Sequence, residues 1–208
     1  MSEKKEKIGL MGGTFNPIHT GHLLLAETAY EQFELDKVFI MPAKNPYHKR
    51  TSGMVSDEMR IDMIKCAIDN NPHFELSFIE FEREGNTYTV DTLKELNRRY
   101  PKTEFYFIMG ADSLYQFAQW REPEEILKRA VILAASRDNI ASSALNSQIH
   151  YLLEQFGIGD IRLLQSPNME ISSHDIRNRV KEHRSIRYLI PEAVREYIEK
   201  HQLYQEKE

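Results

Sequence analysis

Two glycines and two histidines near the start of the chain have the types and spacing that best fit a chemical role. Within residues 7–33 a short apolar run reaches Gly12 and Gly13, and His19 and His22 then open a periodic apolar segment. Glycines allow a sharp turn and a close backbone approach to a ligand. The N–H groups at a helix start bind anions, and residues three apart share a helix face. We interpret the stretch as a strand, a phosphate-sized turn and a helix whose imidazoles donate hydrogen bonds to phosphate oxygens.

A structural role is the alternative for each of these histidines. A single histidine at a helix start is more often structural than a ligand-binding residue. Two histidines at helical spacing behind a Gly-Gly turn favour the phosphate site instead.

Polar segments also follow the other apolar runs that are expected to be strands. Lys44 and Lys49 follow the run 37–42, Asp112 follows a run that ends at Gly110, and Arg137 follows the run 131–135. The carboxyl ends of parallel strands meet at one edge of a sheet, so these residues would share a crevice with the Gly-Gly turn. Basic side chains in such loops can equally face solvent.

The elements that must position these residues alternate along the chain. Short apolar runs alternate with segments of helical periodicity, which is typical of a mostly parallel sheet covered on both faces. We predict an α/β fold, a Rossmann-like doubly wound sheet in a single domain over residues 1–208, with a core at 7–165 and a small C-terminal helical part at 166–203. The predicted strands are 8–11, 37–42, 74–81, 104–109, 131–135 and 161–164. The main predicted helices follow His19 and occupy 57–69, 90–100, 123–129, 144–156, a segment from about Ser172, and 192–200.

Bulk composition fits an ordinary globular protein. The chain has 208 residues, 41% hydrophobic and 28% charged, with a net charge of -5. A mildly acidic chain argues against a nucleic-acid partner. The single cysteine, Cys66, excludes an internal disulfide and a thiolate-rich zinc site. No apolar run approaches the ~20 residues of a membrane span, so we expect a cytoplasmic protein without a membrane partner. The sequence leaves open whether it forms a homo-oligomer.

Two motifs at opposite ends of the chain resemble a known family. Residues 12–22 (GGTFNPIHTGH) are similar to the signature of the nucleotidyltransferase superfamily that carries an HxGH turn, and residues 171–177 (ISSHDIR) to its closing ISSTxIR motif. The resemblance is closest to the bacterial nicotinate mononucleotide adenylyltransferases, through residues 42–49, 86–92, 107–113, 185–198 and Trp120. Three positions depart from the family pattern, because Asn16 replaces the usual Asp, Tyr47 a proline and His174 a threonine.

This resemblance implies an activity. The phosphate of nicotinate mononucleotide would attack the α-phosphorus of ATP in line, giving deamido-NAD and pyrophosphate with no covalent enzyme intermediate. Because the nucleophile is already an anionic oxygen, the protein mainly aligns the substrates and neutralises charge. Mg²⁺ is expected, held mainly by ATP phosphates and water.

The resemblance also implies which residues meet each substrate. His19, His22, Arg177 and Lys44 are the expected catalytic residues, the first three on the triphosphate and Lys44 neutralising phosphate charge. The expected ATP-binding residues are Gly12, Gly13, Thr14, Phe15, His19, His22, Asp112, Arg137, Ser172, Ser173 and Arg177. The expected acceptor-binding residues are Lys44, Lys49, Thr87, Tyr88, Thr89 and Trp120.

Other functions remain open at this point. A transferase of the same superfamily could use another phosphorylated acceptor, such as phosphopantetheine. A non-catalytic nucleotide sensor is suggested by His174, although retention of His19 and His22 argues against it. A transfer-RNA synthetase fragment is disfavoured, because the chain has neither a basic stripe nor an anticodon-binding extension.

Overall fold

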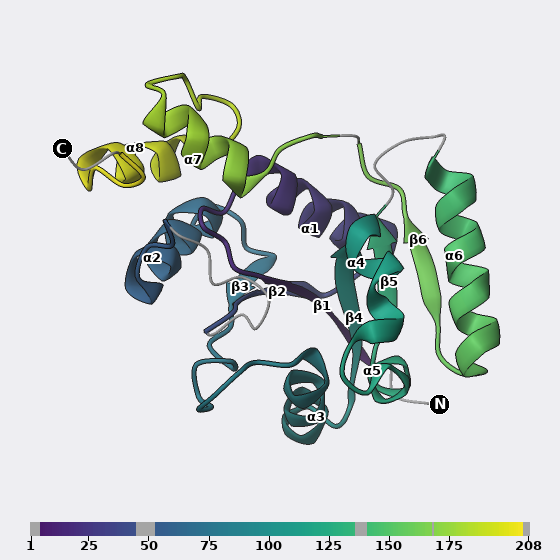
Figure 1. The fold of residues 1–208 in the computed structure, drawn as a ribbon. Helices are drawn as coiled ribbons and strands as arrows, with labels where there is room; N and C mark the ends of the chain where they lie inside the picture. The colour runs from purple at the N-terminus through teal and green to yellow at the C-terminus, as the bar shows by residue number, and fades with distance from the viewer. Residues whose placement is uncertain (1–4, 45–52, 136–140, 168, 206–208) are drawn as a thin grey trace.

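A six-stranded parallel sheet runs through the middle of the molecule (Figure 1). The computed structural model describes residues 5–44, 53–135, 141–167 and 169–205. The strands are β1 (Glu6–Gly13), β2 (Lys37–Pro42), β3 (Phe74–Leu76), β4 (Thr103–Gly110), β5 (Val131–Ala135) and β6 (Ile161–Leu164). They lie in the order β3-β2-β1-β4-β5-β6, and each neighbouring pair is parallel. From β1 the strand order runs outward in one direction through β2 and β3 and in the other through β4, β5 and β6, so the order reverses between β1 and β4, the point where such folds bind ligands. The predicted fold class is confirmed.

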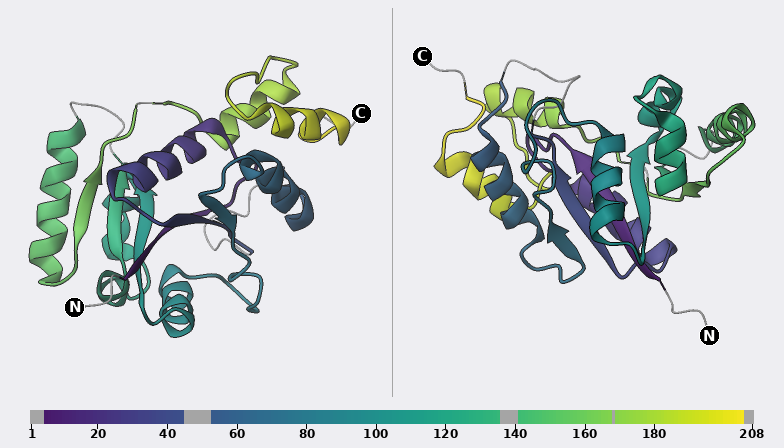
Figure 2. Two further views of the ribbon diagram at one scale, coloured as in Figure 1. Left: turned by 180° about the vertical axis from the view of Figure 1, so that it is seen from behind. Right: turned by 90° about the horizontal axis from the view of Figure 1, so that it is seen from below.

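Helices cover both faces of this sheet (Figures 1 and 2). They are α1 (Thr20–Gln32), α2 (Asp57–Ile68), α3 (Thr89–Arg99), α4 (Ala111–Tyr115), α5 (Pro123–Arg129), α6 (Ala141–Phe156), α7 (Ser173–Lys181) and α8 (Glu192–Lys200), with a 3-10 turn, η1 (Phe117–Gln119). One face packs against α1, α2, α7 and α8, and the other against α3, α4, α5 and α6. Within the described ranges no helix combines the length and the apolarity that a membrane crossing requires.

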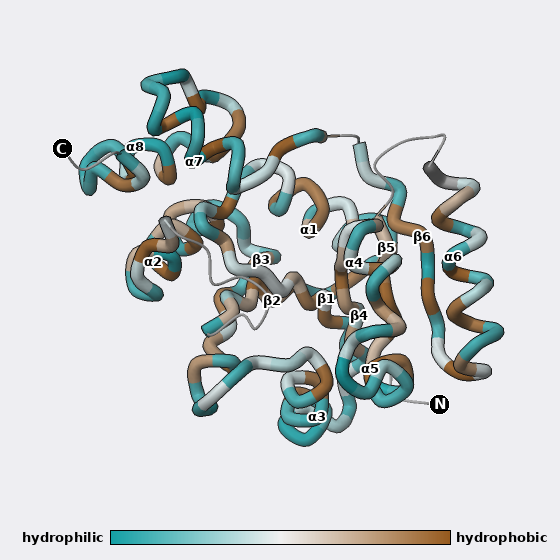
Figure 3. The backbone as a smooth tube through the Cα atoms, in the orientation of Figure 1, coloured by the Kyte–Doolittle hydropathy of each residue, from teal (hydrophilic) through white to brown (hydrophobic). Residues whose placement is uncertain are grey.

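The side chains of the strands pack into two separate hydrophobic cores, one on each face of the sheet. In β4, Tyr106 and Ile108 belong to the core under α1, whereas Phe105 and Phe107 belong to the core under α3. This alternation follows from the two-residue period of a strand. In Figure 3 the tube of α6 alternates between hydrophobic and hydrophilic along its length, as burial of one face requires.

One predicted strand is shorter than its sequence pattern indicates. The alternating run 74–81 forms a strand only over Phe74–Leu76 and then turns. Along β2, Val38 donates its N–H to His73, and Ile40 accepts from the N–H of Ser77. The next β2 residue in that series is Pro42, which has no N–H to donate, so the ladder ends there.

Helix ends follow their local signals. Ser56 caps α2 by accepting from the N–H of Met59, and Ser172 caps α7 in the same way from Asp175. Gly157 follows α6 with a φ of +64°, the left-handed conformation that glycine tolerates best. Each of these ends was predicted from sequence to within a few residues.

Hydrogen bonds tie the C-terminal helical part to the segment between β1 and α1. The hydroxyl of Tyr204 donates to Oδ1 of Asn16 at 2.9 Å, and the N–H of Thr20 donates to the carbonyl of Leu189 at 3.0 Å. Tyr204 is 9% exposed, and burial raises the pKa of its hydroxyl well above the usual range. These contacts hold the segments on either side of α8 against the segment between the Gly-Gly turn and α1.

Candidate active site

A buried arginine shapes the turn after β1. Arg60 is fully buried, and its guanidinium donates to the carbonyl of Thr14 at 2.5 Å, to that of Ala43 at 2.7 Å and to the Asp57 carboxylate at 2.6 Å. In a trans peptide the C=O and the following N–H point in opposite directions. Holding the Thr14 carbonyl inward therefore turns the N–H of Phe15 away from Arg60.

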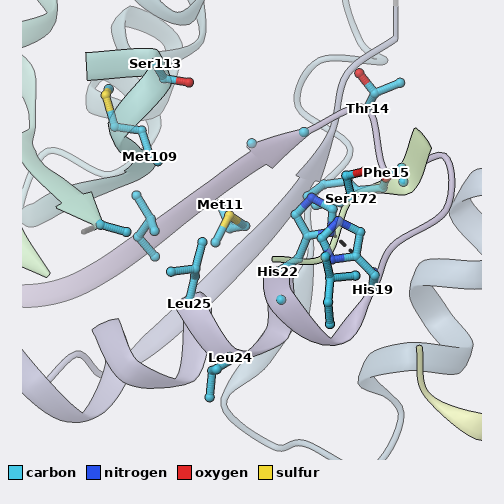
Figure 4. Close-up of a pocket in the computed structure, with 18 of the residues that line it drawn as sticks. Met11, Thr14, Phe15, His19, His22, Leu24, Leu25, Met109, Ser113 and Ser172 are labelled. Carbon is cyan, nitrogen blue, oxygen red and sulfur yellow. Dashed lines mark hydrogen bonds between the residues drawn. The ribbon is translucent and has the colours of Figure 1, made fainter. Parts of the chain in front are cut away.

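The two histidines stack on each other at the start of α1. Their ring centroids lie 3.6 Å apart with the planes at 26°, and His22 also meets the ring of Phe15 edge-on at 5.0 Å (Figure 4). Nδ1 of His22 accepts from the backbone N–H of His19 at 3.3 Å. In the neutral imidazole the proton then sits on Nε2, which makes that atom a donor. A Cβ on Gly21 would lie 3.2 Å from Nδ1 of His19, so glycine between the histidines gives the His19 ring its room.

The start of α7 is fastened to the same segment. Nη1 of Arg177 donates to the carbonyl of Asn16 at 2.8 Å, and the Ser173 hydroxyl donates to that of Pro17 at 2.8 Å. Because that hydroxyl is engaged, a phosphate contact from Ser173 would use its backbone N–H. His174 is exposed and meets the Asn178 side chain at 3.0 Å.

A cavity of about 580 Å³ lies between these two motifs. It gathers the turn after β1, both histidines, the end of β4 and the first turn of α7. Ten of the residues predicted to bind ATP line it: Gly12, Gly13, Thr14, Phe15, His19, His22, Asp112, Ser172, Ser173 and Arg177. The eleventh, Arg137, lies outside the described residues.

A second cavity, of about 590 Å³, lies on the α3 side of the same turn. Four of the residues predicted to bind the acceptor line it: Thr87, Tyr88, Thr89 and Trp120. Both cavities are lined by Gly12, Gly13, Thr14, Phe107, Ser113 and Trp120. Two ligands bound in them would meet at the Gly-Gly turn, which is the arrangement that a reaction between them needs.

Trp120 forms part of the wall shared by the two cavities. Its indole packs edge-on against Phe107, with centroids 6.1 Å apart, and at 44° to Phe117. Because it is half-buried, the indole retains surface facing the cavities. An aromatic face held in this way suits stacking with a planar ring.

Lys44, one of the two lysines predicted to meet phosphate, lines neither cavity. Nζ of Lys44 donates to the carbonyls of Phe81 at 3.3 Å and Arg83 at 3.0 Å. Lys49 lies outside the described residues. The phosphate role of both lysines stays a prediction.

Among the cavity-lining residues that the sequence analysis did not single out, two are charged, Glu80 and Arg121. Glu80 lines the second cavity and accepts hydrogen bonds from Thr92, at 3.1 Å, and from Thr87. Burial raises the pKa of its carboxyl, opposed by those hydrogen bonds and by the charge of Arg83. The strand predicted over 74–81 gave Glu80 no special place. Arg121, also on this cavity, holds its guanidinium 4.7 Å from the centre of the Tyr88 ring, and only its position next to Trp120 could have singled it out.

Comparison with known proteins agrees with this geometry. A family model described as cytidylyltransferase-like matches residues 10–179. A probable nicotinate-nucleotide adenylyltransferase of Lachnoclostridium phytofermentans is 52% identical over 95% of this chain and 98% of its own. One of Thermoanaerobacter sp. is 42% identical over 99% and 98%. The solved structure of Plasmodium falciparum nicotinic acid mononucleotide adenylyltransferase complexed with NaAD has the same fold, with a TM-score of 0.78 at 20% identity over 96% and 97% of the two chains. The chain therefore belongs to the cytidylyltransferase-like family, as its two motifs predicted.

Proposed function

We propose that this protein transfers the adenylyl group of ATP to nicotinate mononucleotide, giving deamido-NAD and pyrophosphate. The observation that carries the proposal is the pair of cavities that meet at the Gly-Gly turn, one beside the stacked histidines and α7, the other beside Trp120. The names of relatives that are 42–52% identical over nearly the whole chain support the choice of substrates.

The reaction is one in-line displacement. An oxygen of the acceptor phosphate forms a bond to the α-phosphorus of ATP, and the bond from that phosphorus to the bridging oxygen breaks as pyrophosphate leaves. The attacking oxygen is anionic, so no side chain has to remove a proton. Catalysis then comes from alignment and from stabilising negative charge on the leaving group.

The first cavity supplies that stabilisation from two sides. His22, through Nε2, and the neighbouring His19 donate to the triphosphate from the α1 side. Arg177 and the N-terminal N–H groups of α7 bind the β and γ phosphates from the other side. Asp112, in the first turn of α4, lines this cavity and is the residue assigned to the adenosine.

The second cavity takes the acceptor. Backbone N–H groups of the segment from Thr87 to Thr89 bind the pyridine carboxylate, and the indole of Trp120 stacks on the ring. Arg121 lines this cavity but pairs with Asp91 at 3.8 Å and with Glu122 at 3.6 Å. The Glu80 carboxylate lines the cavity as well, so selection of a carboxylate depends on the backbone donors of the loop.

Mg²⁺ fits this site as an ion bound mainly to the nucleotide. Among the described residues no three His, Cys, Asp or Glu side chains are grouped to hold a metal. Asp112 is one carboxylate on the first cavity, so most ligands would be phosphate oxygens and water. When bound, Mg²⁺ supplies charge neutralisation on the triphosphate.

The test is pyrophosphate release by the purified chain with ATP and one of three acceptors: nicotinate mononucleotide, nicotinamide mononucleotide or phosphopantetheine. We expect release with nicotinate mononucleotide at the highest kcat/KM. Release only with phosphopantetheine would replace the proposed acceptor. Binding of ATP without release for any of the three would instead identify a nucleotide sensor.

A further inference from the structure

The segment that leads to Thr87 has little regular structure of its own. Residues 81–88 are the second part of the connection from β3, which ends at Leu76, to α3, and their tip, Glu84 to Asn86, is exposed. A loop of this kind keeps one conformation only if side chains from its surroundings hold it. Thr87 and Tyr88 end this segment and line the second cavity, so whatever holds the loop also shapes the cavity wall.

Lys44 holds the first half of the loop. Its ammonium donates to two loop carbonyls, those of Phe81 and Arg83, at 3.3 and 3.0 Å. Lys44 is half-buried and stands two residues after β2, so these charge-assisted hydrogen bonds connect the loop to the end of a central strand.

Glu80 holds the second half of the loop. Its carboxylate accepts from the hydroxyl of Thr92, at 3.1 Å, and from Thr87 at the end of the loop. Thr92 is 2% exposed and lies in α3, and its hydroxyl oxygen also accepts from Nη2 of Arg83 at 2.6 Å. Glu80, Arg83 and Thr87 are thereby joined through one buried residue of α3.

We propose that Lys44 and Glu80 are positioning residues that hold segment 81–88 in its acceptor-binding conformation, and that Lys44 acts in this way instead of neutralising the transferring phosphate. The identity of the acceptor rests on the proposed function, whereas the loop contacts do not. Neither residue lines the first cavity. Their loss therefore weakens acceptor binding and leaves ATP binding unchanged.

The experiment compares Lys44→Met, which keeps the stem and removes the ammonium, with Lys44→Arg and Glu80→Gln. Lys37→Met and Glu75→Gln are matched controls, because these two residues pair with each other on β2 and β3. The loss of charge-assisted hydrogen bonds predicts a KM for nicotinate mononucleotide raised about tenfold in Lys44→Met and Glu80→Gln. The KM for ATP and kcat should stay within about twofold of wild type, a change too small to indicate a lost hydrogen bond. Lys44→Arg, which can still donate to both carbonyls, should restore the KM.

A second readout needs no turnover. Hydrogen exchange measured by mass spectrometry should be faster across residues 81–88 in Lys44→Met and Glu80→Gln, and unchanged in α1. A lower kcat for Lys44→Met, with acceptor KM and loop exchange as in wild type, would show that Lys44 acts on the transferring phosphate, and the proposal would fall. If the wild-type protein does not turn over nicotinate mononucleotide, the proposed function fails, and the exchange data alone decide whether these residues hold the loop.

Discussion

The two stacked histidines have different surroundings. His19 is 6% exposed and precedes the first residue of α1, whereas His22 uses Nδ1 to accept from the backbone and keeps Nε2 as a donor. The sequence predicted that both lie on one helix face, because their spacing matches the helical period. It could not predict the stacking, which depends on the space left by Gly21.

His22→Ala should lower kcat by about 10²–10³-fold, the usual cost of removing one donor to a developing oxyanion. Thermal unfolding should change little, because the ring lies on the cavity wall. Steady-state kinetics and a melting curve on the same preparation check this. A large drop in melting temperature with turnover retained would contradict the catalytic assignment.

His174→Thr should leave kcat and both KM values as in wild type. His174 lines the first cavity, but its side chain is exposed and meets the side chain of Asn178, one turn further along α7. The measurement is kcat/KM for ATP in both proteins. A deep loss of activity would show that this imidazole binds substrate.

Glu80→Gln should change how stability depends on pH. Burial raises the pKa of the Glu80 carboxyl in the folded protein above its unfolded value. The folded state then binds the proton more tightly, so this group's contribution to stability is present at low pH and is lost as pH rises through and above the unfolded pKa. The melting temperature of Glu80→Gln relative to wild type should therefore rise from acid to neutral pH. A difference that does not vary with pH would contradict the raised pKa.

At the scale of elements, apolar runs predicted the strands and capping residues predicted the helix ends. The run 131–135 forms β5 over its full length, because each of its residues is buried. The run 74–81 fails beyond Leu76, because strand formation there depends on a donor that Pro42 of the neighbouring strand lacks. Because the missing N–H belongs to the neighbouring strand, the alternating pattern of the run 74–81 does not reveal it.

Ser172→Ala tests whether the cap of α7 positions Arg177. Its loss should cost about 1 kcal/mol of stability, and it should raise the KM for ATP if the first turn of α7 binds the triphosphate as proposed. Ser56→Ala is the matched control, since Ser56 caps α2 through the same type of contact. Equal effects of the two variants on the KM for ATP would refute a specific role for α7.

At the scale of the molecule, the site forms where chain segments distant in sequence meet at one edge of the sheet. The sequence predicted this convergence for the turn after β1 and the end of β4, because parallel strands end at a common edge. The start of α7 was expected there only from the family resemblance of residues 171–177. The sequence did not predict that Lys44 faces the 81–88 loop, because the direction of a loop side chain depends on contacts made only in the folded chain. Elements and edges were therefore predictable, and side-chain partners across loops were not.

Tyr204→Phe tests how far the C-terminal part supports the site. Asn16 is 3% exposed, and its Oδ1 accepts from Tyr204 and from the N–H of Val55, while its own carbonyl accepts from Arg177. Removing the Tyr204 hydroxyl takes one donor from a buried acceptor, which should cost about 1–2 kcal/mol of unfolding free energy. Because Asn16 also holds Arg177, the KM for ATP should rise while the KM for the acceptor stays constant. Tyr197→Phe, which loses a half-buried contact between α8 and Asp62 of α2, should lower stability less and leave both KM values unchanged. Urea unfolding and steady-state kinetics of the two variants make the comparison. If Tyr204→Phe is destabilised but its KM for ATP is unchanged, the C-terminal part stabilises the fold without positioning Arg177.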